Sequence, residues 1–440
     1  MMNVRNSLVV ASLLFAPVLW ANELTNPDLI SKGEYLSRAG DCVACHTAKG
    51  GKPYAGGLPM ATPIGTVYST NITPDPATGI GNFSLEDFDK AVRHGIAKDG
   101  YTLYPAMPYP SYAKVTDEDI KALYAYFMKG VEPVAQSNRE TDIPWPLSMR
   151  WPLSIWRTLF APEVAATPTS GEIEDAQLER GAYLVQGLGH CGSCHTPRAL
   201  TLQEKALDDS DPAYLSGGQV IDGWVAINLR GNTGDGLGTW SEEDIIETLK
   251  NGRNDHFSSI GAMNDVIQHS GQHFTDTDLL AIAQYLKSLP ATEDAAELFK
   301  ASDETATTLR AGGQPNRGSE LYVDNCAACH RTDGLGASGV FPRLAGNPSV
   351  LSGDPSSMIR VILNGSRLPS TKQAPSDLVM PDFGWRLSDE EAAQLASFIR
   401  TSWGNKAAEV STSDVRAIRK AISEEHENPM LSRAYPSQQH

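Results

Sequence analysis

The chain has 440 residues, of which 41% are hydrophobic and 20% are charged, and its formal net charge is −17. This composition is ordinary for a globular protein, and the length predicts about three domains of roughly 150 residues each. The negative charge argues against a nucleic-acid partner, because that kind of binding requires clustered positive charge.

The first residues have the layout of a secretory signal peptide. Arg5 precedes an apolar run at residues 7–21, and polar residues follow at once. We predict cleavage after Ala21, so that the signal peptide comprises residues 1–21. An uncleaved membrane anchor is the alternative, but the run is shorter than the ~20 apolar residues that span a bilayer. We therefore expect the mature chain to work outside the cytoplasm, in the periplasm.

Helix patterns repeat three times along the mature chain. Each repeat has a first helix with a glycine near its start, a middle helix that ends at a glycine, and a last amphipathic helix behind a Thr or Ser cap. We expect first helices at 32–40, 180–189 and 317–325, middle helices at 84–95, 241–252 and 355–365, and last helices at 116–128, 277–289 and 388–400. The caps of the last helices are predicted to be Thr116, Thr275 and Ser388.

These repeats predict three tandem domains with two connecting regions and a tail. The domains span 22–130, 176–290 and 317–403, and they are joined by a Trp/Pro-rich arm at 131–175 and a linker at 291–316, with a polar tail at 404–440. The tryptophans of the arm suit a membrane boundary or a rigid interface, or else the arm packs on the first domain. The tail shows no amphipathic stripe strong enough for a membrane anchor.

All six cysteines belong to three copies of one motif, C-x-x-C-H. The copies are CVACH (42–46), CGSCH (191–195) and CAACH (326–330). This motif attaches c-type haem: the two thiols bond to the haem vinyl groups and the histidine binds the iron. A redox dithiol or half of a zinc site is the alternative, but structural zinc requires more ligands close by in each segment. We predict three haem c groups, attached through Cys42, Cys45, Cys191, Cys194, Cys326 and Cys329, with His46, His195 and His330 as iron ligands.

A methionine in each domain is the predicted sixth iron ligand, because cytochromes c commonly use a thioether. The candidates are Met107, Met263 and Met380, each between the middle and the last helix. Met107 lies in TLYPAMPYPSY (102–112), where the prolines predict a stiff segment without helix. In the second domain, His256, His269 and His273 are alternatives to Met263.

Haem with six ligands has no open position for a substrate, so we expect no catalytic residue on this chain. The cofactor carries the redox chemistry, and the protein sets its potential and its distance from other groups. An electron relay is therefore expected. A haem peroxidase is less favoured, because it needs an open or releasable sixth position.

The helix order and the glycine positions resemble the class I cytochrome c fold, in which the first and last helices cross. The resemblance implies a mainly α protein, with three tandem class I cytochrome c-like domains joined by Pro-rich linkers. In that fold the glycine of the first helix lets an aromatic residue of the last helix approach. By order, Gly33 would face Tyr124 or Tyr126, Gly181 would face Tyr285, and Gly318 would face Phe398.

Longer runs are similar to the tri-haem cytochrome c subunits of bacterial membrane-associated dehydrogenases. They are GDCVACHTAKGGKPYAGGLPMATPIGTVYSTNITPD (40–75), LYPAMPYPSYAKVTDEDIKALYAYFMKGVEPV (103–134), DIPWPLSMRWPLSIWRTLF (142–160), GLGHCGSCHTPRAL (187–200) and NCAACHRTDG (325–334). The chain most resembles the cytochrome subunits of the FAD-dependent gluconate 2-dehydrogenase type. The quinoprotein alcohol dehydrogenase type is the near relative.

This resemblance implies a separate catalytic subunit that carries FAD or pyrroloquinoline quinone (PQQ). That partner would pass electrons to the haems, and the haems would pass them toward ubiquinone at the periplasmic face of the cytoplasmic membrane. It also implies peripheral membrane association. Two other readings stay open: a subunit of a molybdenum-dependent hydroxylase or an aldehyde dehydrogenase, and a free periplasmic electron carrier.

Overall fold

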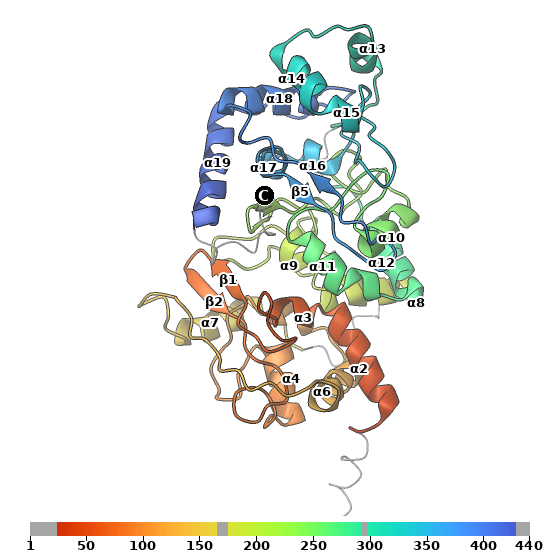
Figure 1. Cartoon of the computed structure of the whole chain (residues 1–440). Helices are drawn as coiled ribbons and strands as arrows, with labels where there is room; N and C mark the ends of the chain where they lie inside the picture. The colour runs from red at the N-terminus through yellow and green to blue at the C-terminus, as the bar shows by residue number, and fades with distance from the viewer. Residues whose placement is uncertain (1–23, 165–174, 293–296, 428–440) are drawn as a thin grey trace, which may run out of the picture.

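The computed structural model describes residues 24–164, 175–292 and 297–427, and it is mainly helical with three short β-hairpins in these ranges. Its large hydrophobic clusters fall in three successive parts of the chain. We name these parts unit 1 (residues 24–143), unit 2 (175–292) and unit 3 (297–427), and we call residues 144–164 the arm. Unit 2 lies between the other two (Figure 1). The predicted signal peptide lies outside the described residues.

Unit 1 contains five helices and one hairpin within its described residues. They are α2 (Pro27–Ala39), α3 (Cys42–Cys45), β1 (Pro59–Thr62), β2 (Gly65–Tyr68), α4 (Leu85–His94), α5 (Tyr109–Tyr112) and α6 (Asp117–Lys129). The strands pair antiparallel, with Met60 opposite Val67. The arm adds α7 (Trp151–Phe160).

Unit 2 follows the same order. Its elements are α8 (Ala176–Ala182), the π-helix η1 (Tyr183–Leu188), α9 (Gly192–His195), β3 (Val220–Ile221), β4 (Trp224–Val225), α10 (Glu242–Asn251), α11 (Met263–His269), the 3₁₀ helix η2 (Gly271–His273) and α12 (Asp276–Ser288). The predicted helix at 180–189 is therefore an α-helix that continues as a π-helix.

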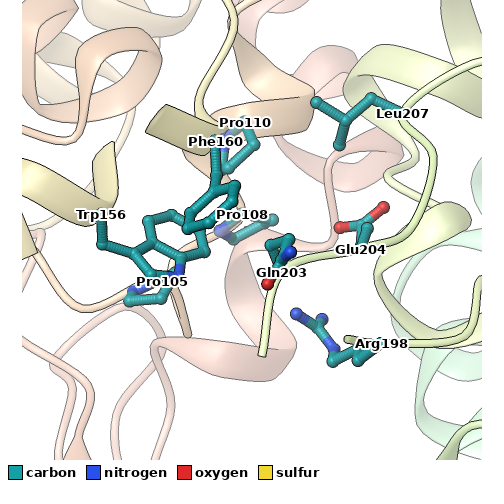
Figure 2. Close-up of a pocket in the computed structure, with 9 residues that line it drawn as sticks. All are labelled: Pro105, Pro108, Pro110, Trp156, Phe160, Arg198, Gln203, Glu204 and Leu207. Atoms are coloured by element: carbon teal, nitrogen blue, oxygen red, sulfur yellow. The ribbon is translucent and has the colours of Figure 1, made fainter. Parts of the chain in front are cut away.

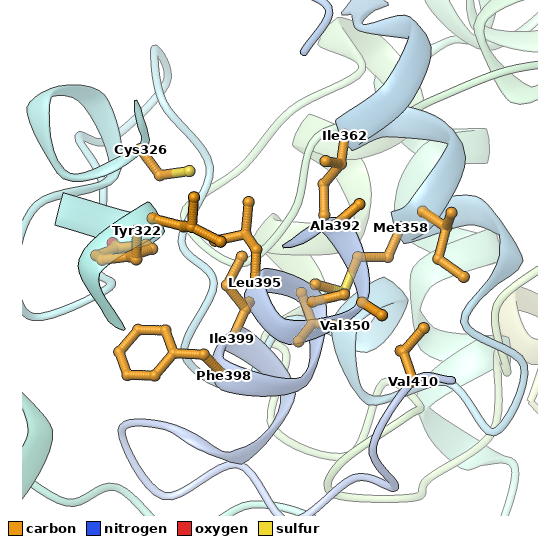
Figure 3. Packing of buried hydrophobic residues seen from close by; sticks show 14 of the residues in the cluster. Tyr322, Cys326, Val350, Met358, Ile362, Ala392, Leu395, Phe398, Ile399 and Val410 are labelled. Atoms are coloured by element: carbon orange, nitrogen blue, oxygen red, sulfur yellow. The ribbon is translucent and has the colours of Figure 1, made fainter. Parts of the chain in front are cut away.

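Unit 3 keeps the first, middle and last helices, but its strand pair follows the middle helix, α16 precedes that helix, and a further helix is added at each end. Its elements are α13 (Glu304–Arg310), α14 (Arg317–Asn325), α15 (Ala327–His330), α16 (Pro348–Leu351), α17 (Ser356–Asn364), β5 (Ser366–Arg367), β6 (Val379–Met380), α18 (Asp389–Thr401) and α19 (Thr412–Glu427). Figure 3 shows its core, in which Met358 and Ile362 of α17 meet Leu395 and Ile399 of α18.

Local sequence signals explain where the repeated helices begin and end. The Thr116, Thr275 and Ser388 side chains accept a hydrogen bond from the third residue of α6, α12 and α18, as the cap prediction requires. The middle helices α4 and α10 stop at Gly95 and Gly252, which adopt the left-handed conformation that glycine tolerates.

The first and last helices of each unit cross at the predicted glycine. A Cβ built on Gly33 would lie 2.0 Å from the Ala122 carbonyl oxygen and 2.7 Å from the Tyr126 Cβ, so Tyr126, not Tyr124, is its aromatic neighbour. Gly181 and Gly318 meet Tyr285 and Phe398 in the same way, at 2.7 and 2.8 Å. The predicted class I cytochrome c-like crossing is therefore confirmed.

Three segments differ from the expectations. The stretch 102–112 contains α5, because Pro110 occupies the first turn of the helix, where proline is tolerated; the prediction of no helix was wrong. The linker contributes α13, whose Ala306 and Leu309 join the unit 3 core. The polar tail contains α19, an amphipathic helix that buries Val415 and Ile422 against unit 3.

The N-terminal part of the predicted arm packs on unit 1. Asn71 donates to the carbonyl of Val134 (2.7 Å), and the Asp142 amide donates to the Thr66 carbonyl (2.9 Å). The Tyr68 hydroxyl donates to the Asp142 carboxylate (2.5 Å). The expected packing of the predicted connecting region (131–175) on the first domain is therefore seen for residues 134–142, which we include in unit 1.

Candidate haem sites

The three C-x-x-C-H motifs fold into the same tight turn. Each lies on a one-turn helix, α3, α9 or α15. In each turn the histidine amide donates to the carbonyl of the first cysteine at 2.9 Å, from His46 to Cys42, His195 to Cys191 and His330 to Cys326. This turn gathers two thiols and an imidazole, as covalent haem attachment requires.

Each motif histidine is oriented by a hydrogen bond that the sequence did not reveal. The Nδ1 atoms lie 2.7, 2.8 and 2.9 Å from a backbone carbonyl, those of Thr70, Ile227 and Pro342 respectively. A proton on Nδ1 leaves Nε2 as the metal-binding atom. Burial lowers the pKa of all three imidazoles, which favours the neutral form that binds iron.

In unit 3 the attachment motif and the predicted methionine line one cavity. Its walls include Cys326, Cys329, His330 and Met380, and most other lining side chains are apolar. The cavity has a volume of ≈ 190 Å³. Two thiols, an imidazole and a thioether around an apolar space fit a covalent haem with His/Met ligation. The ligation itself stays a prediction.

The other two methionines also lie between the middle and the last helix of their units. Met107 follows α4 and precedes α6, and it packs on the same hydrophobic cluster as Cys42. Met263 is the first residue of α11, between α10 and α12. Met380 lies in β6, opposite Ser366 of β5. The three units therefore hold the candidate ligand by three different local structures.

The alternative histidine ligands of unit 2 have other surroundings. His256 stacks on Trp240 with ring centroids 5.7 Å apart, and its Nε2 lies 3.5 Å from an Asp244 oxygen. His269 and His273 lie at the ends of α11 and η2. Among the described residues, no cluster of three or more His, Cys, Asp or Glu side chains could hold a metal ion, so the zinc reading gains no further ligands.

The prolines around Met107 form a contact surface as well as a stiff loop. Figure 2 shows Pro105, Pro108 and Pro110 beside Trp156 and Phe160 of α7, with residues 198–207 of unit 2 on the other side. The crevice among them has a volume of only ≈ 10 Å³. The Trp156 indole N–H donates to the Thr201 carbonyl at 2.8 Å, which ties the arm to unit 2. Proline is thus used where unit 1 meets the arm and unit 2.

Comparison with known proteins identifies the family of the chain. The cytochrome c family model matches residues 30–130 and 315–403. The gluconate 2-dehydrogenase cytochrome c subunit of Pantoea cypripedii is 57% identical over 418 residues, covering 94% of each chain. The cytochrome c subunit of the quinone alcohol dehydrogenase of Gluconobacter oxydans is 53% identical, covering 89% of this chain and 82% of the relative.

A third relative, the fructose dehydrogenase cytochrome subunit of Gluconobacter japonicus, is 38% identical over 411 residues, covering 89% of this chain and 82% of the relative. These matches extend over all three units, whereas the family model covers units 1 and 3 in part. The chain belongs to the family of the cytochrome c subunits of dehydrogenase complexes.

Proposed function

We propose that this chain is the electron-transfer subunit of a dehydrogenase complex and carries three covalent haems, one in each unit. The observation that carries the proposal is the threefold occurrence of one turn, with two cysteines, a histidine and an oriented Nδ1. When bound, each haem carries one electron at a time between Fe(II) and Fe(III). The chain contributes attachment, axial ligands and the distance between haems.

Met107, Met263 and Met380 are the proposed sixth ligands. Substitution of one of them by alanine should remove about one third of the methionine–iron absorption, because each haem has its own methionine. The potential of that haem should also fall, since a thioether stabilises Fe(II). Met60 offers a control, because it lies in β1, before the middle helix, and not between the middle and the last helix. If Met107→Ala and Met60→Ala have equal spectra, Met107 is not a ligand.

The proposed partner is a catalytic subunit of the gluconate 2-dehydrogenase type that carries FAD. The 57% identity over nearly the whole chain supports this choice. A PQQ-carrying alcohol dehydrogenase subunit is the second candidate, favoured by the 53% identity to a subunit of that type. The substrate site would lie on the partner, so the identity of the partner decides the substrate.

Ubiquinone is the proposed acceptor, with the complex attached to the periplasmic face of the cytoplasmic membrane. The described residues contain no helix long and apolar enough to cross a bilayer. The arm supports peripheral attachment, because Trp145, Trp151 and Leu159 are 79%, 63% and 67% exposed. Tryptophan favours the membrane boundary, and residues 143–162 contain arginines but no acidic residue in a chain of net charge −17.

Vesicle flotation tests this attachment. The chain should float with anionic phosphatidylglycerol vesicles more than with neutral phosphatidylcholine vesicles, and Trp145→Ser with Trp151→Ser should abolish the difference. The buried Trp240 of unit 2 is unsuitable as a control, so the exposed Trp385 of unit 3 (79%) is the matched control. Equal losses for Trp385→Ser and the arm variants would exclude the arm as the membrane contact.

Substrate reduction of the native complex tests the function. The complex is purified from membranes, and the haem spectrum is recorded after addition of gluconate or ethanol. Reduction by gluconate through a flavin subunit supports the first candidate. Reduction by ethanol alone, through a quinoprotein, replaces it with the second. A chain that purifies alone and is reduced by neither substrate would indicate a free electron carrier.

A further inference from the structure

Units 1 and 2 are joined by two reciprocal hydrogen bonds between equivalent residues. The Tyr35 hydroxyl of α2 donates to Asp278 of α12, and the Tyr183 hydroxyl of unit 2 donates to Asp119 of α6, both at 2.5 Å. Each tyrosine follows the crossing glycine by two residues, and each aspartate is the third residue of the last helix. The interface therefore has approximate twofold symmetry, as an isologous dimer interface does.

Each of the two aspartates also pairs with a basic residue of its own unit. Lys32 lies 2.7 Å from Asp119, and Arg180 donates two hydrogen bonds of 2.8 Å to Asp278. Each aspartate thus receives a cation from its own unit and a tyrosine hydroxyl from the other unit. Bonds to a charged acceptor are stronger than neutral ones, so the two units are held in one fixed relation.

This interface brings the two haem-attachment loops together. Gly40, two residues before Cys42, lies against Leu188 of η1, because a Cβ on Gly40 would be 3.3 Å from the Leu188 Cδ1. The Gly40 carbonyl accepts a hydrogen bond from the Tyr112 hydroxyl at 2.9 Å. His190 directly precedes Cys191, and its ring packs edge-on against Tyr112, with centroids 5.6 Å apart.

The region around this contact is buried. Leu188 is 2% exposed and Tyr112 is 6% exposed, and both belong to or face the unit 1 core. The Ser270 hydroxyl donates to the Ala39 carbonyl at 3.2 Å. The helix α11, which begins with Met263, also contacts the attachment helix α3.

We propose that units 1 and 2 exchange electrons directly through this interface, with Tyr112 joining the attachment loops by its contacts with Gly40 and His190. One path runs along the backbone from Cys42 to the Gly40 carbonyl, crosses the hydrogen bond to the Tyr112 hydroxyl and the ring contact between Tyr112 and His190, and reaches Cys191. In each exchange one iron goes from Fe(II) to Fe(III) and the other from Fe(III) to Fe(II), and no proton or further reactant takes part. His190 is a positioning residue, since it acts through the neighbouring cysteine.

Unit 3 lacks the residues that make this pairing. Glu320 stands where the other units have Tyr35 and Tyr183, and it lies 3.0 Å from Arg317 of its own unit. Arg317 also pairs with Glu391, the counterpart of the two aspartates, at 2.8 Å. A glutamate at the tyrosine position would face a carboxylate across such an interface, and like charges repel. Direct exchange of this kind is therefore specific to units 1 and 2.

The inference rests on the proposed three-haem function, and the test separates the two. Haem content per chain, measured by mass spectrometry, reports on the function. Electron exchange is then measured from the paramagnetically shifted haem methyl resonances of the partly reduced full chain. Exchange between two haems moves or broadens their resonances together. Spectra of Met107→Ala and Met263→Ala assign the resonances to haems of units 1 and 2.

The two test variants are His190→Asn and Tyr112→Phe, and Tyr124→Phe is the matched control. Asparagine tolerates the positive φ of His190 (39°) but lacks the ring. Tyr124 donates a hydroxyl hydrogen bond to the Phe83 carbonyl (2.8 Å) within unit 1. We expect His190→Asn and Tyr112→Phe each to slow exchange between the haems of units 1 and 2 several-fold, with unchanged midpoint potentials and methionine–iron absorption. Tyr124→Phe should match the wild type.

The contrary results are distinct. Three haems per chain, with wild-type exchange in His190→Asn, would overturn the inference and leave the proposed function standing. A changed potential or lost methionine–iron absorption in His190→Asn would also overturn it, because the residue would then act on the haem site itself. Fewer than three haems per wild-type chain would overturn both.

Discussion

Unit 2 meets its two neighbours through interfaces of different construction. Toward unit 1, equivalent residues bond reciprocally, Tyr35 to Asp278 and Tyr183 to Asp119. Toward unit 3, unlike elements meet: the Arg360 guanidinium of α17 donates to the Gly223 carbonyl (3.2 Å) and lies over the Trp224 ring. The first interface is isologous and the second is heterologous.

The difference shows how a repeated unit can be used in two ways. When two units pair through equivalent faces, both faces are occupied and no third unit can join through the same surface. A third unit has to attach elsewhere, and here it does so beside the Met263 segment: Ser258 and Ile260 of unit 2 line the cavity of unit 3. The replacement of tyrosine by Glu320 keeps unit 3 from competing for the paired faces.

The largest effect is expected at the heterologous interface, from Arg360→Met. The Arg360 side chain is 2% exposed and forms two hydrogen bonds with Glu425 of α19, at 2.6 and 2.9 Å. Its removal leaves a carboxylate without its cation, which typically costs about 3–5 kcal/mol. Native-state hydrogen exchange should show a loss of about 3 kcal/mol in the free energy of opening of α17 and α19.

The matched control for that variant is Arg416→Met. Arg416 belongs to α19, where its side chain is 70% exposed and lies 3.5 Å from Asp389. Exposed pairs contribute about 0–1 kcal/mol, so this variant should change little. Equal losses in the two variants would mean that the Arg360–Glu425 pair does not hold α17 and α19 together.

The isologous interface should respond more weakly to Tyr183→Phe and to Tyr35→Phe. Each change removes one hydroxyl that bonds to a carboxylate, and such bonds contribute about 1.5–3 kcal/mol. We expect amides near the interface in both units to lose about 1.5 kcal/mol of protection in hydrogen exchange. Reciprocal pairing would be contradicted if the loss of protection were confined to one unit. It would also be contradicted if the loss of protection were no larger than that in Tyr124→Phe.

Acid should weaken the same interface through Asp278. Burial alone would raise the pKa of Asp278, but hydrogen bonds from Arg180 and Tyr35 outweigh it and hold the pKa below its ordinary value. A lowered pKa in the folded state contributes stability above the unfolded pKa of about 3.9, and this contribution is lost as pH falls through the folded value. The stability difference between wild type and Asp278→Asn should be constant from about pH 7 to 5 and shrink below about pH 4. A difference that persists at the lowest pH would exclude this role.

The smallest effect is expected for Ser338→Ala at the heterologous interface. The Ser338 hydroxyl donates to the carboxylate of Asp255 in unit 2, at an exposed position. Surface changes of this kind usually stay within about 0.5 kcal/mol. Hydrogen exchange in units 2 and 3 should therefore match the wild type. A loss as large as that of Arg360→Met would show that the surface bonds, and not the buried arginine, hold unit 3.

The sequence predicted the helices and the attachment motifs because those depend on neighbouring residues. Caps such as Ser388 and glycine stops such as Gly252 act within one turn. The Nδ1 partners Thr70, Ile227 and Pro342 could not be predicted, since they are backbone carbonyls at unequal distances along the chain from their histidines. The helix α19 was missed because Val415, Ile418 and Ile422 are spaced as on one helix face, but within a mainly charged segment.

The interface between units 1 and 2 did leave a signal in the sequence. The segments KGEYL and RGAYL share a tyrosine at one position, and TDED and TDTD share an aspartate at another, whereas unit 3 has Glu320 and Glu391. Within a single segment, these residues indicate only a helix and its cap. Their pairing across units depends on how two helix crossings dock, which local patterns do not determine.

The most direct test of the central claim is a reductive titration of the purified chain with its haems counted by mass spectrometry. The account predicts three covalent haems and the uptake of three electrons per chain, with methionine–iron absorption from each haem in the oxidised protein. Two haems or two electrons per chain, with one C-x-x-C-H motif left unmodified, would contradict it.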